Sequence, residues 1–443
     1  MTLDELLASP RSVLLVGFGV ANRAVAASLV ARGHQVVAID DGPNDDARAA
    51  AAALGIALSS PDDVEPYVNG ADLVIPTPGL PERHAVFGSA DASGIPVVSE
   101  LDLAAVWDDR PILAVTGTNG KTTTVELAVA ALQQGGLGAV AAGNTDIPLV
   151  AAIDDPDIDV FVVEASSFRL ARASRFRPTV AVWLNFAPDH LDVHRDLERY
   201  EAAKAKLFEL GAAGTLVANA DDAVVMGNVP SDARVVTFAA AADADWHVEG
   251  AALHGPGGPF VAVDGLWRSL PHDIANTLAV AAAVAALGIE PAAVARAAAD
   301  FSALAHRVSP VGELDGQVWF DDSKATTPHA TLAALRGFDE VVLVAGGRNK
   351  GVDLGELAAG IDHVRAVVAI GDAACEVAAA FSGRVPVARA DSMESAVDAA
   401  RDFSTGEVPV LLSPGCASFD WYTSYGERGD DFARIVRERE AAS

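Results

Sequence analysis

The chain has 443 residues, a formal net charge of −30 at pH 7 and 51% hydrophobic residues, which supplies enough apolar surface for several packed cores. The acidity disfavours nucleic acid or an anionic membrane as a partner. Two cysteines, Cys375 and Cys416, exclude a disulfide framework and a cysteine-based zinc site, and we expect both to be reduced core thiols. No apolar run is long enough for a membrane span and the first residues lack a secretion signal, which predicts a cytoplasmic protein.

Lysine is rare in this chain. Of the 31 basic residues only five are lysines, at positions 121, 204, 206, 324 and 350. Arginine cannot replace lysine where a compact ammonium or a reactive primary amine is required. Each remaining lysine is therefore a candidate functional residue, except Lys206, which we expect to be a solvated helix residue.

The first part of the chain alternates between strand and helix patterns. Apolar runs over 12–17 and 35–40 flank a helical pattern over 21–33, which is typical of a parallel sheet covered by helices. Gly17 and Gly19 begin a dinucleotide-style turn, and an acidic pair, Asp40 and Asp41, lies at the next strand end. By themselves these residues leave an NAD-binding domain as the rival interpretation, and Asn22 replaces the third glycine of that motif.

The second part opens on a phosphate-binding motif. Residues 114–129, AVTGTNGKTTTVELAV, read as a buried strand, a glycine-bearing loop and the start of a helix. Such a loop directs backbone N–H groups and the positive helix end at one point, which suits a polyphosphate. Lys121 would reach the β and γ phosphates of ATP, and the Thr122 hydroxyl would bind Mg²⁺. The other residues predicted to bind ATP here are Gly117, Thr118, Asn119, Gly120 and Thr123.

Two further strand ends carry candidate metal ligands. Glu164 ends the strand pattern over 159–166, and His190 follows the pattern over 179–186. Oxygen ligands with one imidazole suit a second Mg²⁺ ion or Mn²⁺. Lys204 lies on the next predicted helix, and because a protonated lysine cannot bind a metal, it must be altered or serve another purpose.

Strand and helix patterns alternate to the end of the chain, so the predicted class is α/β. We predict three domains: a Rossmann-like domain over 1–100, a P-loop ATPase-type parallel-sheet domain over 101–304, and a second Rossmann-like domain over 305–443.

The segments GTNGKTT, EASSF, NFAPDHLDVH and YEAAK resemble the central domain of the Mur ligases, the ATP-dependent amide-forming enzymes of peptidoglycan precursor synthesis. The resemblance implies that CO2 carbamylates Lys204, which turns it into a ligand for one of two Mg²⁺ ions. It implies nucleotide contacts from Asn276, Arg307 and Asp322. Asp273 stands where the family often carries a second asparagine. The implied catalytic residues are Lys121, Glu164, His190, Lys204 and Lys324, and the implied metal ligands are Thr122, Glu164, His190 and Lys204.

The final segment SPGCASFDWYTSYGERG resembles the members of this family that add D-glutamate to UDP-N-acetylmuramoyl-L-alanine through an acyl phosphate. The resemblance implies that the first domain binds UDP rather than NAD and that Lys324 contacts phosphate. The implied D-glutamate contacts are Thr326, Lys350, Ser418, Phe419 and Tyr425. The implied contacts to the UDP substrate are Gly17, Gly19, Val20, Ala21, Asp40, Asp41, Thr77, Gly79, Asn144 and Ser166.

Three alternatives stay open at this point. The chain could be a ligase of the same build for another amino acid, including a folylpolyglutamate synthetase, a nucleotide-dependent sensor of UDP-muramoyl precursors, or an oxidoreductase. The GFG turn and the SPGCASFD segment disfavour the other ligases. Intact Glu164, His190, Lys204 and Lys350 disfavour a sensor, and an oxidoreductase would bind nicotinamide without needing ATP. We expect a monomer with small-molecule substrates.

Overall fold

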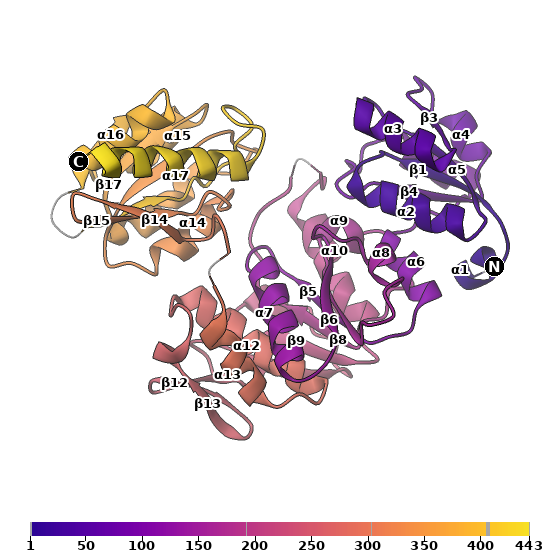
Figure 1. The fold of residues 1–443 in the computed structure, drawn as a ribbon, viewed down its shortest axis with the longest axis horizontal. Coiled ribbons are helices and arrows are strands. Elements are labelled where there is room, and N and C mark those ends of the chain that lie inside the picture. Colours follow the sequence, from indigo (N-terminus) through magenta and orange to yellow (C-terminus); the bar gives the residue numbers. More distant parts are fainter. Residues whose placement is uncertain (1, 192, 303, 405–407, 443) are drawn as a thin grey trace. The chain divides into compact units, whose positions relative to one another are not determined.

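The computed structural model describes residues 2–191, 193–302, 304–404 and 408–442, and Figure 1 follows the chain from indigo at the N-terminus to yellow at the C-terminus. Contacts divide it into two compact units. One comprises Met1–Phe186, Asp192–Ala262 and Asn276–Ala299, and the other comprises Ala187–Leu191, Val263–Ala275 and Asp300–Ser443. In the described part of the chain, no helix combines the length and the apolar character that crossing a bilayer requires.

The first sheet is parallel and has the strand order β3-β2-β1-β4. Its inner strands are almost entirely apolar, and Leu15, Val25, Leu29 and Leu73 form part of its core. The strands are β1 (Ser12–Val16), β2 (Gln35–Ile39), β3 (Ala57–Ser59) and β4 (Leu73–Pro76), and the helices are α1 (Leu3–Leu7), α2 (Val20–Ala31), α3 (Asp45–Leu54), α4 (Glu65–Asn69) and α5 (Ala85–Ser93).

The second sheet is parallel with the order β10-β9-β8-β5-β7-β6. The central strand β5 is buried throughout, and Val115 pairs in register with Glu164 of β7. The carboxyl ends of β5 and β7 therefore meet at one edge of the sheet. The strands are β5 (Ile112–Thr116), β6 (Ala139–Gly143), β7 (Val160–Glu164), β8 (Val180–Trp183), β9 (Thr215–Asn219) and β10 (Arg234–Phe238).

Helices follow most strands of this sheet, as parallel connections require. They are α6 (Glu100–Trp107), α7 (Lys121–Gln134), α8 (Leu149–Ala152), α9 (Ser167–Leu170), α10 (Leu197–Leu210), α11 (Ala223–Gly227), α12 (Pro271–Ala286) and α13 (Pro291–Asp300). The β-rich insert is a small antiparallel sheet, β11 (His247–Glu249), β12 (Ala252–Gly255) and β13 (Gly258–Ala262), followed by the turn η1 (Val263–Gly265). Its attachment to β10 is a bridge between Phe238 and Trp246.

The third sheet has the order β14-β15-β19-β16-β17-β18. Only the β14–β15 pair among its described pairings is antiparallel. The strands are β14 (Ser309–Leu314), β15 (Gln317–Asp321), β16 (Val341–Gly346), β17 (Val364–Ile370), β18 (Val387–Arg389) and β19 (Val410–Leu412). The helices are α14 (Pro328–Leu335), η2 (Leu354–His363), α15 (Ala374–Phe381), α16 (Met393–Phe403) and α17 (Tyr425–Ala442).

These sheets confirm the predicted α/β class, whereas the exact domain limits at 100 and 304 stay a prediction. One expectation about the cysteines is wrong: Cys416 is buried, but Cys375 is exposed. Cys375 lies on α15, and the apolar positions of that helix that face the core are Ala374, Val377 and Phe381, so its thiol is on the outer side of the helix.

A buried arginine holds together the loops of the third sheet. Arg428 of α17 is 1% exposed. It donates to the Ser323 hydroxyl at 2.8 Å and the Ser323 carbonyl at 2.7 Å, and to the carbonyls of Cys416 and Ala417 at 3.2 Å. Burial lowers its pKa to about 10, so it stays charged at neutral pH. These carbonyls belong to the two segments that carry the predicted amino-acid contacts.

We therefore expect Arg428→Met to lower the free energy of unfolding of the C-terminal unit by about 3–5 kcal/mol, because it leaves buried carbonyls without donors. Chemical denaturation followed by fluorescence would measure the loss. Arg434→Met is the matched control, since Arg434 lies on the same helix, is about half exposed and pairs with Asp431 and Glu438, a surface arrangement worth less than about 1 kcal/mol. Equal losses in the two variants would contradict the role of Arg428.

Candidate active site

The phosphate loop connects the buried strand β5 to helix α7. Gly120 has a φ of 85° and caps the helix, a backbone conformation that favours glycine. The Lys121 ammonium folds back over the loop and donates to the carbonyls of Gly117 and Thr118, both at 2.9 Å. A Cβ on Gly120 would lie 2.6 Å from the Asn276 side-chain oxygen. The loop thus has the predicted geometry, and Asn276 lies beside it.

Asn185, which the sequence analysis did not select, fixes the shape of this loop. It follows β8, and its backbone carbonyl accepts from the Thr118 N–H at 3.1 Å. Its side chain accepts from the Asn119 N–H at 2.9 Å and donates to the Asn119 carbonyl at 3.2 Å. Asn185 begins the motif NFAPDHLDVH, so the signal was present in the sequence, but an asparagine after a strand has many ordinary uses.

The predicted magnesium ligands of the central sheet lie together. The Thr122 hydroxyl donates to the Glu164 carboxylate at 2.8 Å, and the other oxygen of that carboxylate accepts from the Asn144 amide at 3.0 Å. Glu164 is 4% exposed. A hydroxyl and a carboxylate beside a phosphate loop are oxygen donors of the kind that Mg²⁺ prefers. Thr122 and Glu164 would therefore suit as ligands of a magnesium ion that accompanies a bound nucleotide.

Lys204 reaches the same loop from helix α10. It is 1% exposed, and its ammonium donates to the Gly117 carbonyl at 2.7 Å and lies 4.6 Å from the centre of the Tyr200 ring. The Tyr200 hydroxyl in turn lies 3.2 Å from the Thr118 hydroxyl. Two lysine ammonium groups, from Lys121 and Lys204, thus share one carbonyl oxygen.

His190 belongs to the second unit. Its φ of 57° is rare for a residue other than glycine and is typical of constrained functional sites. Its Nε2 lies 3.3 Å from the Asp189 carboxylate, whose other oxygen accepts from Lys350 at 3.1 Å. Burial alone would raise the pKa of Asp189, but His190 and Lys350 hold it below the usual value. Because Glu164 and Lys204 belong to the first unit, a metal site shared with His190 stays a prediction.

The predicted nucleotide residues Arg307 and Asp322 lie at the start of the third sheet. Burial raises the pKa of Asp322 to about 7, although it accepts from the Ser413 hydroxyl at 2.7 Å and feels the charge of Arg307. Arg268 links this segment to the start of α12 by hydrogen bonds. It pairs with Asp273 through two bonds, at 2.6 and 3.1 Å, and donates at 2.8 Å to the Arg307 and Val308 carbonyls. This pairing gives a physical reason for an aspartate at position 273, where an asparagine could not form an ion pair.

The residues predicted to bind the UDP substrate come from two strand ends of the first sheet. A Cβ on Gly17 would lie 2.5 Å from the Thr77 side chain, so the loops after β1 and β4 are in contact. The Asp40 carboxylate accepts from the Phe18 and Gly42 N–H groups at 2.7 and 2.9 Å, while Asp41 and Val20 are exposed.

Asn22, which replaces the expected third glycine, is buried and has a structural use. Its amide donates to the carbonyls of Val16, Gly17 and Ile75. It therefore joins β1 to β4 at the point where a ligand phosphate would approach. Gly19 and Gly79 lie in the same two loops and Ala21 lies in the first turn of α2, and the role of each of these residues toward the UDP substrate stays a prediction.

A buried histidine connects the β4 loop to helix α9. His194 lies 3.1 Å from the Glu82 carboxylate and 3.0 Å from the Ser167 hydroxyl. With Thr77, Gly79 and Phe168 it lines a small cleft. The neighbouring Ser166 hydroxyl is buried without a hydrogen-bond partner among the described residues, as expected where a ligand or water completes the site. Ser166 is predicted as a site residue from the sequence, whereas His194 is not.

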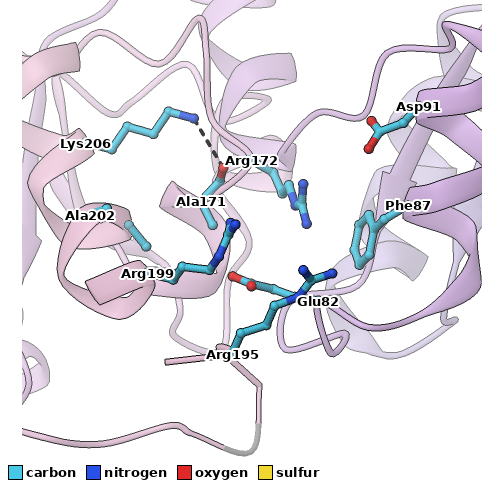
Figure 2. A pocket seen from close by; sticks show the side chains of 10 residues that line it. Glu82, Phe87, Asp91, Ala171, Arg172, Arg195, Arg199, Ala202 and Lys206 are labelled. Atoms are coloured by element: carbon cyan, nitrogen blue, oxygen red, sulfur yellow. Dashed lines mark hydrogen bonds between the residues drawn. The ribbon is translucent and has the colours of Figure 1, made fainter. Parts of the chain in front are cut away.

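A cavity of about 420 Å³ adjoins this cleft. Figure 2 shows the guanidinium groups of Arg172, Arg195 and Arg199 around Glu82, with Phe87 and Asp91 on the other side. Lys206 lines the cavity too. It is part-buried, donates to the Ala171 carbonyl at 3.2 Å, and has its pKa lowered by burial. The expectation that Lys206 is a solvated helix residue is therefore wrong.

The predicted D-glutamate residues follow strands of the third sheet. The Lys324 ammonium donates to the Tyr425 hydroxyl at 3.0 Å, and the Ser323 hydroxyl donates to the Tyr425 carbonyl at 2.8 Å. Ser418 is buried, whereas Phe419 is 62% exposed. Thr326 precedes α14, and Lys350 follows β16 and pairs with Asp189. The structure brings together Lys324 with Tyr425; the ligand contacts of all these residues stay predictions.

Comparisons with known proteins agree with this geometry. The model of the Mur ligase middle domain matches residues 115–284, and that of the Mur ligase glutamate ligase domain matches residues 306–416. The chain is similar to the UDP-N-acetylmuramoylalanine--D-glutamate ligase of Frankia casuarinae, with 41% identity over 97% of this chain and 94% of the relative. It is similar to the ligase of the same name of Pelotomaculum thermopropionicum, with 38% identity over 96% and 97%.

Among solved structures, the UDP-N-acetylmuramate-alanine ligase MurC of Thermotoga maritima matches with a TM-score of 0.60 and 20% identity, over 98% of this chain and 99% of that chain. At that identity the match supports the fold alone. The two relatives match nearly the whole chain, so the similarity covers all three large sheets, and more than a third of the aligned residues are identical. By its sequence and its fold, this chain belongs to the Mur ligase family.

Proposed function

We propose that the chain catalyses the ATP-dependent ligation of D-glutamate to UDP-N-acetylmuramoyl-L-alanine, forming ADP and phosphate. The observation that carries the proposal is the 41% identity to a ligase named for this reaction over 97% of the chain. The matched length includes the first sheet, the phosphate loop and the SPGCASFDWYTSYGERG segment, to which we attribute the binding of the UDP substrate, ATP and D-glutamate. A family member for another amino acid would be expected to differ in that last segment.

The reaction we propose begins at the phosphate loop. The γ-phosphate of ATP passes to the free carboxylate of the UDP substrate, and the amine of D-glutamate then attacks the acyl phosphate and expels phosphate. Lys121 lies on the loop next to the carbonyl oxygens of Gly117 and Thr118, from which it would move to the transferring phosphate. Its charge would offset the negative charge that develops on that group.

Thr122 and Glu164 would hold a Mg²⁺ ion, which screens the phosphate charges when bound. Lys204 is proposed to react with CO2 to give a carbamate, which would act as a ligand for a second ion with Glu164 and His190. The carbonyl shared by Lys121 and Lys204 supports this proposal, because the part-buried ammonium group of Lys121 and the buried one of Lys204 repel each other at that oxygen. A carbamate would replace that repulsion by attraction.

The dianionic D-glutamate would bind to cations and hydroxyl groups of the third sheet, from Lys350, Thr326 and Ser418, beside Phe419 and Tyr425. Lys324, held by Tyr425 at 3.0 Å, would contact the acyl phosphate. We propose that the reaction takes place in the cytoplasm, where ATP is available, and that the enzyme acts as a monomer.

The function is tested by measuring phosphate release from ATP with UDP-N-acetylmuramoyl-L-alanine and one amino acid at a time. We expect release to require D-glutamate and to stay near background with L-glutamate, D-aspartate or L-alanine, since the presence and spacing of the two carboxylates and the chirality must all fit the third-sheet residues. If phosphate release requires another amino acid, the residues of the third sheet bind that amino acid and not D-glutamate. ATP and UDP-substrate binding without release would favour a sensor, and binding of nicotinamide without ATP dependence would favour an oxidoreductase.

The carbamate proposal predicts that Lys204→Ala lowers turnover by about 10²–10³-fold or more, the effect of removing one group that stabilises the transition-state charge. Added acetate should restore part of the activity, because a free carboxylate can occupy the space of the carbamate. Lys206→Ala is the control on the same helix and should keep its activity. Full activity of Lys204→Ala without acetate would refute the proposal.

The raised pKa of Asp322, about 7, predicts a pH-dependent KM for ATP. We propose that the ionised carboxylate binds the nucleotide, because it is a stronger hydrogen-bond acceptor than the neutral acid, and at pH 6 only about a tenth of it is ionised. KM should therefore fall by up to about tenfold as the pH rises from 6 to 8. The Asp322→Asn variant has no ionisable group at this position. Its KM for ATP should therefore change with pH only through the titration of ATP itself. The same pH profile in both proteins would exclude Asp322 as the cause.

A further inference from the structure

The small antiparallel sheet carries a group of metal-ligating side chains that the proposed reaction does not use. His247 and Glu249 are two residues apart on β11, so their side chains leave the same face of the strand. His254 on β12 is the direct register partner of His247. Each of these three side chains offers one possible ligand atom, and the three atoms all lie within 4.8 Å of one another. Among the described residues, no other group of three or more histidine, cysteine, aspartate or glutamate side chains meets this condition.

The two imidazoles lie stacked across β11 and β12. Their ring centroids are 5.7 Å apart with an interplanar angle of 23°. The Nδ1 of His247 lies 3.0 Å from the Ala244 carbonyl, which can only accept a hydrogen bond, so Nδ1 carries the proton and Nε2 keeps its lone pair. A ring N–H bound to a carbonyl is the usual partner arrangement of a metal-bound histidine. The Glu249 carboxylate lies 3.5 Å from Nδ1 of His254.

The strands that carry these ligands are held from the opposite face. Leu253, between His254 and Ala252, is fully buried and pairs with Val248. Trp246 exchanges backbone hydrogen bonds with Thr237 and Ala239 at 3.0 and 2.9 Å, and a Cβ on Gly255 would lie 2.5 Å from its ring. The two histidine backbones are therefore fixed relative to each other, and only side-chain rotation remains.

We propose that His247, Glu249 and His254 bind one divalent transition-metal ion of the Zn²⁺ class. Two imidazoles favour Zn²⁺, Co²⁺, Ni²⁺ or Cu²⁺ over Mg²⁺, which prefers oxygen. A tetrahedral Zn²⁺ ion keeps its ligand atoms about 3.4 Å apart. The three ligand atoms of this group lie within 4.8 Å of one another, and rotation of the exposed Glu249 side chain can bring its carboxylate closer to the two imidazoles. Three protein ligands leave one position for water, and the bound ion would cross-link β11 to β12.

The test uses the full chain without an affinity tag, stripped of metal and kept in excess Mg²⁺ so that the phosphate-loop site is filled. Titration with Zn²⁺ in a calorimeter should give one bound ion per chain. The double variant His247→Gln/His254→Gln should lose this binding event, and Glu249→Gln should weaken it by at least about tenfold. Co²⁺ should give a visible absorption band that the double variant lacks.

His363→Gln is the matched control, because His363 lies in the other unit with its Nδ1 beside the Phe338 carbonyl at 2.7 Å. It should bind Zn²⁺ like the unchanged chain. Circular dichroism and phosphate release report on the fold and on the main reaction, neither of which should change in the double variant. Equal Zn²⁺ stoichiometry and affinity in the double variant and the unchanged chain would overturn the proposal, as would the absence of binding to the unchanged chain.

Discussion

The carbonyl oxygen of Gly117 is the point on which the candidate site depends, because it accepts hydrogen bonds from both Lys121 and Lys204. Lys121 belongs to the helix that starts at the phosphate loop, and Lys204 comes from α10, more than eighty residues later. Their meeting requires β5, the loop and α10 to have one fixed arrangement. Asn185 supplies part of that rigidity by bonding the loop from β8. Like charges that meet at one oxygen repel each other, and the burial of Lys204 strengthens this repulsion, so an anion bound beside them would be attracted by both.

The central part of this site could be predicted from the sequence because its signals are local. The loop GTNGKTT lies between a strand pattern and a helix pattern, and Glu164 ends an apolar run, so parallel-sheet geometry brings both to one edge. The structure bears this out through the bond between Thr122 and Glu164. The α/β class follows in the same way, from apolar runs separated by helical patterns.

Other residues could not be identified because their roles arise only from contacts distant in sequence. Asn22 joins β1 to β4 across more than fifty residues, and Arg428 joins α17 to Ser323 across about a hundred. Neither residue type indicates such a role by itself, since asparagines are common in loops and arginines on helix surfaces. Lys206 was misjudged for a related reason: the cavity that buries it is formed partly by Phe87 and Asp91 of the first sheet's region.

The charge distribution gives four of the five rare lysines a common physical explanation. All three proposed substrates are anions, and a chain with a net charge of −30 repels them at long range unless cations are concentrated at the sites. Four of the five lysines stand in the predicted sites, and Lys206 lines the arginine-rich cavity of Figure 2. Salt screens charges that are more than about 8–10 Å apart, which weakens the general repulsion but not the buried contacts of Lys204. The acidic surface therefore opposes anions in general, whereas the sites admit those that can reach the lysines directly.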